Sequence, residues 1–407
     1  QEISLLAQQS IPPALSPVVF GDDPRNLLLK TLREIPFEKM GERERLLLAG
    51  LDRTWGKRQE VLSTEVSSSS LSIFRELLLD NGVEKEFSKS DLAQLANIKD
   101  DPLIKQVGCF AIGGKAETCI EQSTSQVMAV RLLLSQGFPL VALIVGTGLL
   151  LVGAWKLFRK TFQPWPELTP LPLNLVDMTL LIGGGFVVLG EVASPILFAP
   201  ITTAISSGFS PAIQEATKVI IGYCSMSIAP LLILRNQLSH LNDIQVPRGG
   251  WLQWRIRPWS TAVFQALRGW LMVMPFVLLS SWLATLLFGD QGGSNPLLEM
   301  VLGSRNTFAL SLLVLTTVVL APLFEEIIFR GIHLPVLVKT IGLPLGIVLS
   351  ALAFGIAHLS VGELAPLVVL GTGLSIVRLS SGRLFPCVLM HALWNGITFS
   401  NLLLLGG

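Results

Sequence analysis

The chain has 407 residues, of which 50% are hydrophobic and only 14% are charged, with a formal net charge of +1 and a mean hydropathy of +0.60. A soluble protein of this length needs far more charge to cover its surface, so the composition excludes an ordinary soluble domain and predicts an all-α, polytopic membrane protein. The near-zero net charge gives no support to nucleic-acid binding, and we expect no nucleic-acid partner.

Residues 1–135 differ from the rest of the chain, because they carry many charges and short amphipathic patterns, such as those at 25–35 and 71–82. Leucines recur in these patterns at helical spacing, which predicts a small helical extramembrane domain. The chain begins at Gln1 rather than Met. We therefore expect that a preceding signal anchor, which would export this domain, has been removed or left out.

Two of the four cysteines lie in this N-terminal part. Cys109 and Cys119 flank a loop with two glycines, and in an oxidising compartment they can form a disulfide. Two unpaired, buried thiols are an equal alternative. Cys224 and Cys387 fall in apolar runs, where we expect them to pack as small apolar residues.

Eight apolar runs are candidate membrane-spanning helices, since a span needs roughly 20 apolar residues. They cover approximately 138–158, 176–199, 213–234, 264–288, 307–329, 342–359, 363–379 and 384–405. The sequence thus divides into the N-terminal domain (1–135), a part with the first three spans and a loop (136–262), and a part with the other five spans (263–407).

Basic residues follow the odd-numbered spans. They are Lys156, Arg159 and Lys160 after the first, Arg235, Arg248, Arg255 and Arg257 after the third, Arg330 and Lys339 after the fifth, and Arg378 and Arg383 after the seventh. If eight spans alternate, these residues share one side of the membrane, which the positive-inside rule assigns to the cytoplasm. We therefore expect the N-terminal domain to be non-cytoplasmic.

The fifth run ends in Glu325 and Glu326, with Arg330 close behind. A charge at hydrocarbon depth costs ~2.5–3.5 kcal/mol on insertion scales, so such residues are usually paired or functional. On a helix Glu326 and Arg330 share a face and can pair, whereas Glu325 points about 100° away and is free to face a cavity. A carboxylate in a low dielectric is a good general base, although an ion-pair network at the cytoplasmic mouth would also use these residues.

Two further runs carry histidines. His391 and Asn395 are four residues apart and face the same way, so they can hold a metal or donate to an oxyanion. His358 shares a face with Phe354 and would, taken alone, equally suit a packing role. A span that begins at 342 places His358 near its outer end, far from Glu325. A later start, after a short interfacial helix at about 332–345, would bring the two closer, and both alternatives stay open. No HExxH zinc motif occurs.

The motifs FEEIIFRG, FGIAH and HALWN, in this order and spacing, resemble those of the CPBP intramembrane proteases, which include the CAAX prenyl proteases and the bacterial Abi proteins. The resemblance covers roughly residues 264–405. It implies an all-helical membrane fold and endopeptidase activity on membrane-associated protein or peptide substrates in the lipid bilayer. Members with an N-terminal extension suggest a bacterial inner membrane or a thylakoid as the location. The prenylated CAAX substrate is not expected in a bacterium.

The resemblance also implies roles for individual residues. Glu325 would activate water and His358 would help to orient it, while His391 and Asn395 would stabilise the oxyanion. Glu326 and Arg330 would support these groups. This scheme is a glutamate protease that needs no cofactor. The rival scheme is a metallo-endopeptidase with zinc on Glu325, His358 and His391.

Two other classes of function are compatible with the same apolar segments and the polar residues within them. One is a non-proteolytic membrane protein of this fold that acts as a scaffold, chaperone or immunity factor. The other is a transporter in which intramembrane acids such as Glu191 and Asp177 are coupling sites, although the chain shows no inverted repeat.

Overall fold

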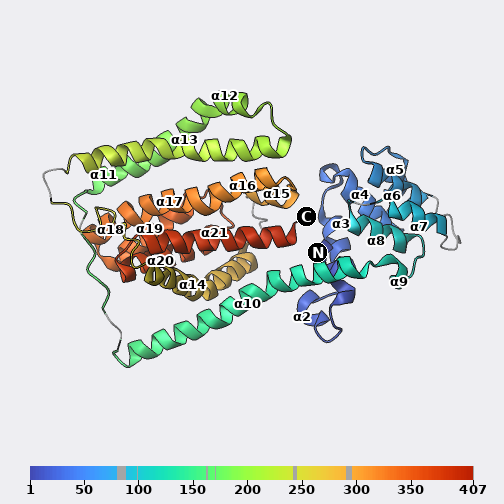
Figure 1. The fold of residues 1–407 in the computed structure, drawn as a ribbon, viewed down its shortest axis with the longest axis horizontal. Helices are drawn as coiled ribbons and strands as arrows, with labels where there is room; N and C mark the ends of the chain where they lie inside the picture. Colours follow the sequence, from blue (N-terminus) through green and yellow to red (C-terminus); the bar gives the residue numbers. More distant parts are fainter. Residues whose placement is uncertain are drawn as a thin grey trace. The chain divides into compact units, whose positions relative to one another are not determined.

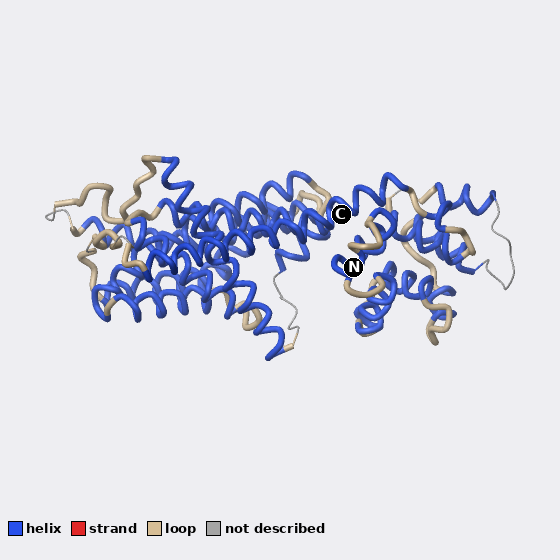
Figure 2. Tube along the Cα trace, turned by 90° about the horizontal axis from the view of Figure 1, so that it is seen from below, coloured by secondary structure: helices blue, strands red, loops and turns tan. Residues whose placement is uncertain are grey.

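A computed structural model describes residues 1–79, 89–98, 100–161, 164–169, 171–241, 245–289 and 296–406. Within these ranges the chain consists of helices joined by loops, with no strand (Figure 2), so the predicted all-α class is confirmed. The chain forms two compact units, the N-terminal unit Gln1–Phe138 and the membrane unit Pro139–Gly407. The further division predicted at residue 263 stays a prediction.

The N-terminal unit consists of short helices (Figure 1). They are α1 (Glu2–Ala7), η1 (Gln8–Ser10), α2 (Ser16–Phe20), α3 (Pro24–Glu34), η2 (Phe37–Lys39), α4 (Glu42–Leu51), α5 (Arg58–Ser63), α6 (Ser69–Leu79), α7 (Lys89–Ala96), α8 (Pro102–Ala111) and α9 (Ala116–Cys119). The amphipathic patterns at 25–35 and 71–82 correspond to α3 and to α6, and residues 80–82 lie outside the described ranges.

Local sequence explains why these helices begin where they do. Asp23 accepts a hydrogen bond from the amide of Arg25, and Pro24 is the first residue of α3, where its missing N–H costs nothing. Leu28 and Leu32, four residues apart, then lie on the buried face of the helix. The periodicity of the sequence therefore gives both the helix and its packed side.

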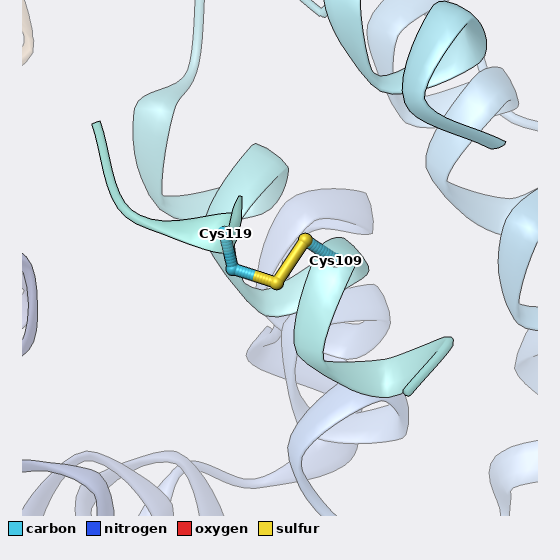
Figure 3. Close-up of a disulfide and its surroundings, with 2 residues drawn as sticks. All are labelled: Cys109 and Cys119. Atoms are coloured by element: carbon cyan, nitrogen blue, oxygen red, sulfur yellow. A yellow bond between two sulfur atoms is a disulfide. The ribbon is translucent and has the colours of Figure 1, made fainter. Parts of the chain in front are cut away.

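Two contacts tie the N-terminal unit together. The guanidinium of Arg43 in α4 pairs with Glu2 at 2.7 Å and with Asp101, which caps α8, at 2.5 Å. Cys109 at the end of α8 and Cys119 in α9 form a disulfide (Figure 3). Of the two alternatives open for these cysteines, the structure therefore has the bridged one.

The membrane unit contains longer helices. They are α10 (Gln122–Phe158, which begins in the N-terminal unit), α11 (Leu175–Thr179), η3 (Leu180–Ala193), α12 (Ser194–Ser206), α13 (Pro211–Ser239), α14 (Trp259–Phe288), α15 (Pro296–Gly303), α16 (Thr307–Val314), η4 (Leu315–Leu320), α17 (Ala321–Glu326), η5 (Ile327–His333), α18 (Leu334–Ile341), α19 (Leu343–Ile356), α20 (Leu364–Ser381) and α21 (Phe385–Leu405). The elements η3, η4 and η5 are π-helical stretches within longer helices.

Seven helices among the described residues are long and apolar enough to cross a membrane, so the chain is an integral membrane protein. They cover Gln122–Phe158, Leu175–Ser206, Pro211–Ser239, Trp259–Phe288, Thr307–Ile341, Leu364–Ser381 and Phe385–Leu405. The eighth predicted span, 342–359, is the 14-residue helix α19. At 1.5 Å per residue it is about 21 Å long, which is short of the ~30 Å hydrocarbon thickness.

The fifth span also differs from its prediction. It continues as one helix from Thr307 to Ile341 and does not end near 329. Arg330 therefore lies inside the helix and is fully buried, as is Arg378 in α20. The topology prediction treats both as loop residues, which is wrong, and Lys339, counted with Arg330, also lies in the last turn of this helix. A buried, partnered arginine does not interrupt a helix, although in the sequence it looks like the end of an apolar run.

The loop that precedes α14 contacts the loop between α20 and α21. The Arg255 guanidinium donates to the Gly382 carbonyl at 3.0 Å, and the amide of Leu384 donates to the carbonyl of Gln253 at 3.1 Å. In the core of the membrane unit, α20 packs against α14 and α19, and α21 packs against α14 (Figure 1). Cys387 is buried in this core as expected, whereas Cys224 is exposed on α13, contrary to expectation.

Candidate active site

Glu325 and Glu326 lie near the middle of the 35-residue helix Thr307–Ile341. They end α17, a short α-helical segment between the π-helical stretches η4 and η5. π-Helical turns are rare, and they are frequently found at functional sites. Here they flank the two acids on both sides.

The Glu326–Arg330 pair forms as the spacing predicts. Arg330 Nη1 donates to Glu326 Oε1 at 2.8 Å, and neither side chain has any exposed surface. Arg330 Nη2 also donates to the carbonyl of Gly371 at 3.0 Å, and the guanidinium carbon lies 4.3 Å from the centre of the Phe354 ring. The positive charge is therefore enclosed by an acid, a carbonyl and an aromatic face.

Glu325 faces away from this pair, toward the two histidines. Its Oε2 lies 3.9 Å from Nε2 of His358 and 3.8 Å from Nε2 of His391. Oε2 is buried and has no hydrogen-bond partner among the described residues. Three side chains from three helices thus meet at one carboxylate oxygen, and a water bonded at ~2.8 Å to Oε2 and to either ring nitrogen fits these separations.

The second ring nitrogen of each histidine, Nδ1, already has a hydrogen-bond partner. Nδ1 of His358 lies 2.8 Å from the carbonyl oxygen of Phe354, and Nδ1 of His391 lies 2.9 Å from Glu326 Oε1. Because a carbonyl or a carboxylate can only accept, both Nδ1 atoms carry a proton, as assigned from this bonding. Nε2 of each ring therefore faces Glu325, with a lone pair when the ring is neutral and with a second N–H when the ring is an imidazolium.

A tight helical hairpin brings His358 to the level of Glu325. The chain turns at Gly342, whose φ of 88° suits glycine, and α18 packs against α19 on either side of the turn. Glu325 precedes Gly342 by 17 residues and His358 follows it by 16, so antiparallel helices place them side by side. The expectation that a span from 342 carries His358 far from Glu325 is wrong, because Glu325 is not at the end of its own span.

Asn395 contacts a different part of the site. Its amide nitrogen donates to the backbone carbonyl of Thr317 at 2.8 Å, and Thr317 belongs to the π-helical stretch η4. Asn395 lies one helical turn beyond His391 on α21. The side chain therefore joins α21 to the helix that carries the two acids, and one of its two N–H groups is committed to this bond.

Two groups near Glu325 come from helices that the motifs do not include. The hydroxyl of Tyr223 in α13 donates to Glu325 Oε1 at 3.1 Å. Glu191 in η3 is half-buried and interacts electrostatically with Glu325 and His358. Neither had been predicted to belong to this site, although a lone tyrosine or acid in an apolar run is a usable signal. Asp177, grouped earlier with Glu191, serves as part of the capping box of α11.

The candidate zinc ligands are Glu325, His358 and His391. Two ligand atoms on a tetrahedral zinc at ~2.0–2.1 Å lie about 3.3 Å apart, so separations of 3.8 and 3.9 Å are too wide. Across the described part of the chain, no group of three His, Cys, Asp or Glu side chains is arranged to hold a metal ion. The residues as placed do not fit zinc.

Comparisons with known proteins agree with the motif resemblance. Residues 307–397 match the family model of the type II CAAX prenyl endopeptidase Rce1-like proteins, and residues 1–130 match a domain of unknown function (DUF8675). No curated protein and no solved structure matches the chain. The matched segment contains all six candidate residues and is narrower than the predicted 264–405. The segment 307–397 belongs to the CAAX-type intramembrane protease family, as its motifs predict.

Proposed function

We propose that the protein is an intramembrane endopeptidase that hydrolyses peptide bonds of membrane-associated protein substrates, with Glu325 as the general base. The observation that carries this proposal is the buried, unbonded Oε2 of Glu325, which faces Nε2 of both His358 and His391. A carboxylate oxygen held away from bulk water, with free lone pairs, can take a proton from a water beside it.

The first chemical step uses Glu325 and His358. A water between Oε2 and His358 Nε2 donates one hydrogen to each, so that its lone pair is directed at the substrate carbonyl carbon. As the C–O bond forms, the proton passes to Glu325, and the carbonyl oxygen becomes an oxyanion. Glu325 then returns this proton to the leaving amine as the C–N bond breaks, which restores the carboxylate.

The oxyanion needs hydrogen-bond donors, which we assign to His391 and Asn395. Asn395 keeps one N–H free after its bond to the Thr317 carbonyl. His391 donates from Nε2 only as the imidazolium, because Nδ1 already holds a proton for Glu326. The carboxylates of Glu325 and Glu326 flank the ring and provide the counter-charge for this form. Preorganised donors of this kind are worth about 10²–10³ in rate.

Glu326 and Arg330 act as supporting residues. Oε1 of Glu326 accepts both from Arg330 Nη1 and from His391 Nδ1, so one oxygen fixes the ring and is itself fixed by the cation. Because both side chains are fully buried, this arrangement has little freedom to rearrange. The pair therefore sets the orientation of His391 and does not meet the substrate.

We further propose that the N-terminal unit lies on the non-cytoplasmic side of a bacterial inner membrane or a thylakoid. The disulfide supports this side, because such bonds persist in oxidising compartments. The basic residues that remain in the loops, such as Arg248, Arg255 and Arg257, support a cytoplasmic position for the opposite end of the spans.

Zinc on Glu325, His358 and His391 is the alternative chemistry. One feature favours it: ring nitrogens that bind metals usually donate their other N–H to a carbonyl or a carboxylate, as both histidines do here. It requires the three side chains to close by several tenths of an ångström. The chelator experiment below separates it from the metal-free scheme.

The test is cleavage of a library of membrane-anchored substrates by the purified protein in lipid. We expect cleavage by the unmodified chain, no cleavage by Glu325→Ala, and no effect of chelators. Loss of activity on chelation, with recovery on added zinc, would replace the metal-free scheme by the zinc scheme. A folded protein that cleaves nothing in the library would favour the scaffold or immunity-factor function over proteolysis.

A further inference from the structure

Tyr223 is the single tyrosine of the chain, and it lies in α13, outside the family-matched segment 307–397. Its hydroxyl has two acceptors within reach, Glu325 Oε1 at 3.1 Å and the Ala321 carbonyl at 3.5 Å. A phenol has one proton to donate, and the shorter contact ends on a group that carries charge when ionised. Hydrogen bonds to charged acceptors are about twice as strong as neutral ones, so the proton is directed at Glu325.

The phenol ring is held in place by packing. It meets the ring of Phe324 edge-on, with centroids 6.0 Å apart and planes at 89°, and it is partly buried. A tyrosine has few rotatable bonds, and an edge-to-face contact restrains those that it has. The hydroxyl is therefore presented to Glu325 from a fixed direction. Phe324 directly precedes Glu325, so the contact joins α13 to α17 beside the reacting carboxylate.

The two oxygens of Glu325 consequently have different surroundings. Oε1 accepts the bond from Tyr223, whereas Oε2 has no bond and lies between the two histidine rings. Without a donor on Oε1 the carboxylate can rotate and present either oxygen, or neither, to the water. We propose that Tyr223 is a positioning residue, which fixes Glu325 so that Oε2 is the basic oxygen. This inference rests on the proposed role of Glu325.

The active site then extends beyond the matched family segment. The segment 307–397 supplies the base, the histidines and Asn395, and α13 supplies the group that orients the base. This assignment gives α13, which packs against α16 and η3, a direct function in the site. A fragment that begins after α13 should accordingly contain every motif and still lack the restraint on Glu325.

The kinetic test is Tyr223→Phe, which removes the hydroxyl and keeps the ring. We expect kcat to fall by about 10- to 100-fold, because misplacement of a reacting group by ~1 Å can cost 10²-fold. KM should not change and the variant should fold, since the ring packing is kept, and the loss of the hydrogen bond to the carboxylate should lower the thermal stability only modestly. The matched control is Ser225→Ala in the same helix, which removes a buried hydroxyl bonded only to the Gly222 carbonyl and should leave kcat unchanged.

A second test does not depend on activity. Because the chain has one tyrosine, growth on 3-fluorotyrosine labels Tyr223 alone, and its ¹⁹F resonance reports on the hydroxyl. Glu325→Gln should shift this resonance, whereas Ser225→Ala should not. The inference is overturned if Tyr223→Phe keeps the unmodified kcat, or if the Glu325→Gln spectrum equals that of the unmodified chain.

The two tests also separate this inference from the proposed function. Full cleavage by Glu325→Gln would refute Glu325 as the base, whatever the ¹⁹F spectrum shows. Loss of cleavage in Glu325→Gln, together with normal kcat in Tyr223→Phe, would refute only the positioning role. If Tyr223→Phe folds poorly, the ¹⁹F comparison decides the matter on the folded, labelled protein.

Discussion

Replacing Glu326 by Gln should destabilise the membrane unit by about 3–5 kcal/mol, because it leaves the Arg330 charge buried without an anion. The structure shows that Glu326 and Arg330 form a buried ion pair, for which the loss of one partner is strongly destabilising. Both side chains have 0% exposure, their charged atoms are 2.8 Å apart, and water does not reach either group. After the substitution, the guanidinium keeps the Gly371 carbonyl and the Phe354 ring, and neither of these carries a negative charge.

The assay is reversible unfolding of the purified protein in mixed micelles, with the free energy of unfolding compared between variants. The control is the double variant Glu326→Leu with Arg330→Met, which removes both charges and should cost less than Glu326→Gln alone, since an apolar pair has no unpaired ion. Glu326→Gln should also lower kcat, because Glu326 holds Nδ1 of His391. A loss below about 1 kcal/mol, the value typical of exposed pairs, would refute the buried geometry.

Three further outcomes follow from the described contacts. Gly371→Ala should cost about 1–3 kcal/mol in unfolding free energy, because its added Cβ would lie 3.2 Å from Arg330 Nη2 in a closed core. Replacing both cysteines of the disulfide by serine should lower the stability of the N-terminal unit by about 2–3 kcal/mol, measured by amide exchange under oxidising conditions; no change would contradict the bridge. The hydrogen bond from Arg33 lowers the pKa of Asp52 below its ordinary 3.8. The stability from this bond is therefore complete above that pH and is lost as the pH falls through the lowered pKa, so Asp52→Asn should flatten the acid-side loss of protection in the N-terminal unit.

The membrane spans could be predicted well from the sequence, because each is an apolar run of sufficient length. The prediction failed where a charge is buried. Arg330 looks like the end of a run, yet the helix continues to Ile341, since Glu326 neutralises the guanidinium one turn away. The same error made His358 seem far from Glu325, although the next helix does begin where the sequence predicts, at Leu343. Hydropathy cannot distinguish an exposed arginine from a paired, buried one.

The candidate site was predictable to the extent that its contacts are local. The Glu326–Arg330 pair follows from a four-residue spacing, which a helix turns into a contact. Tyr223 reaches Glu325 across 102 residues of sequence, and no periodicity encodes such a contact. The separation of the zinc ligands is likewise a matter of tertiary packing, because His358 and His391 come from different helices. Sequence motifs therefore identify the residues of a site, whereas the distances between those residues depend on the tertiary packing.

In the proposed mechanism, Glu325 takes a proton from the attacking water. The most direct measurement is the single-turnover cleavage rate of one membrane-anchored substrate by the unmodified chain and by Glu325→Gln, with the folding of both checked by thermal unfolding. Gln keeps the shape of the side chain and cannot accept the proton. We expect Glu325→Gln to cleave at a rate at least ~100-fold lower at unchanged stability, at the low end of what a general base contributes. Cleavage by Glu325→Gln at the unmodified rate would contradict this mechanism.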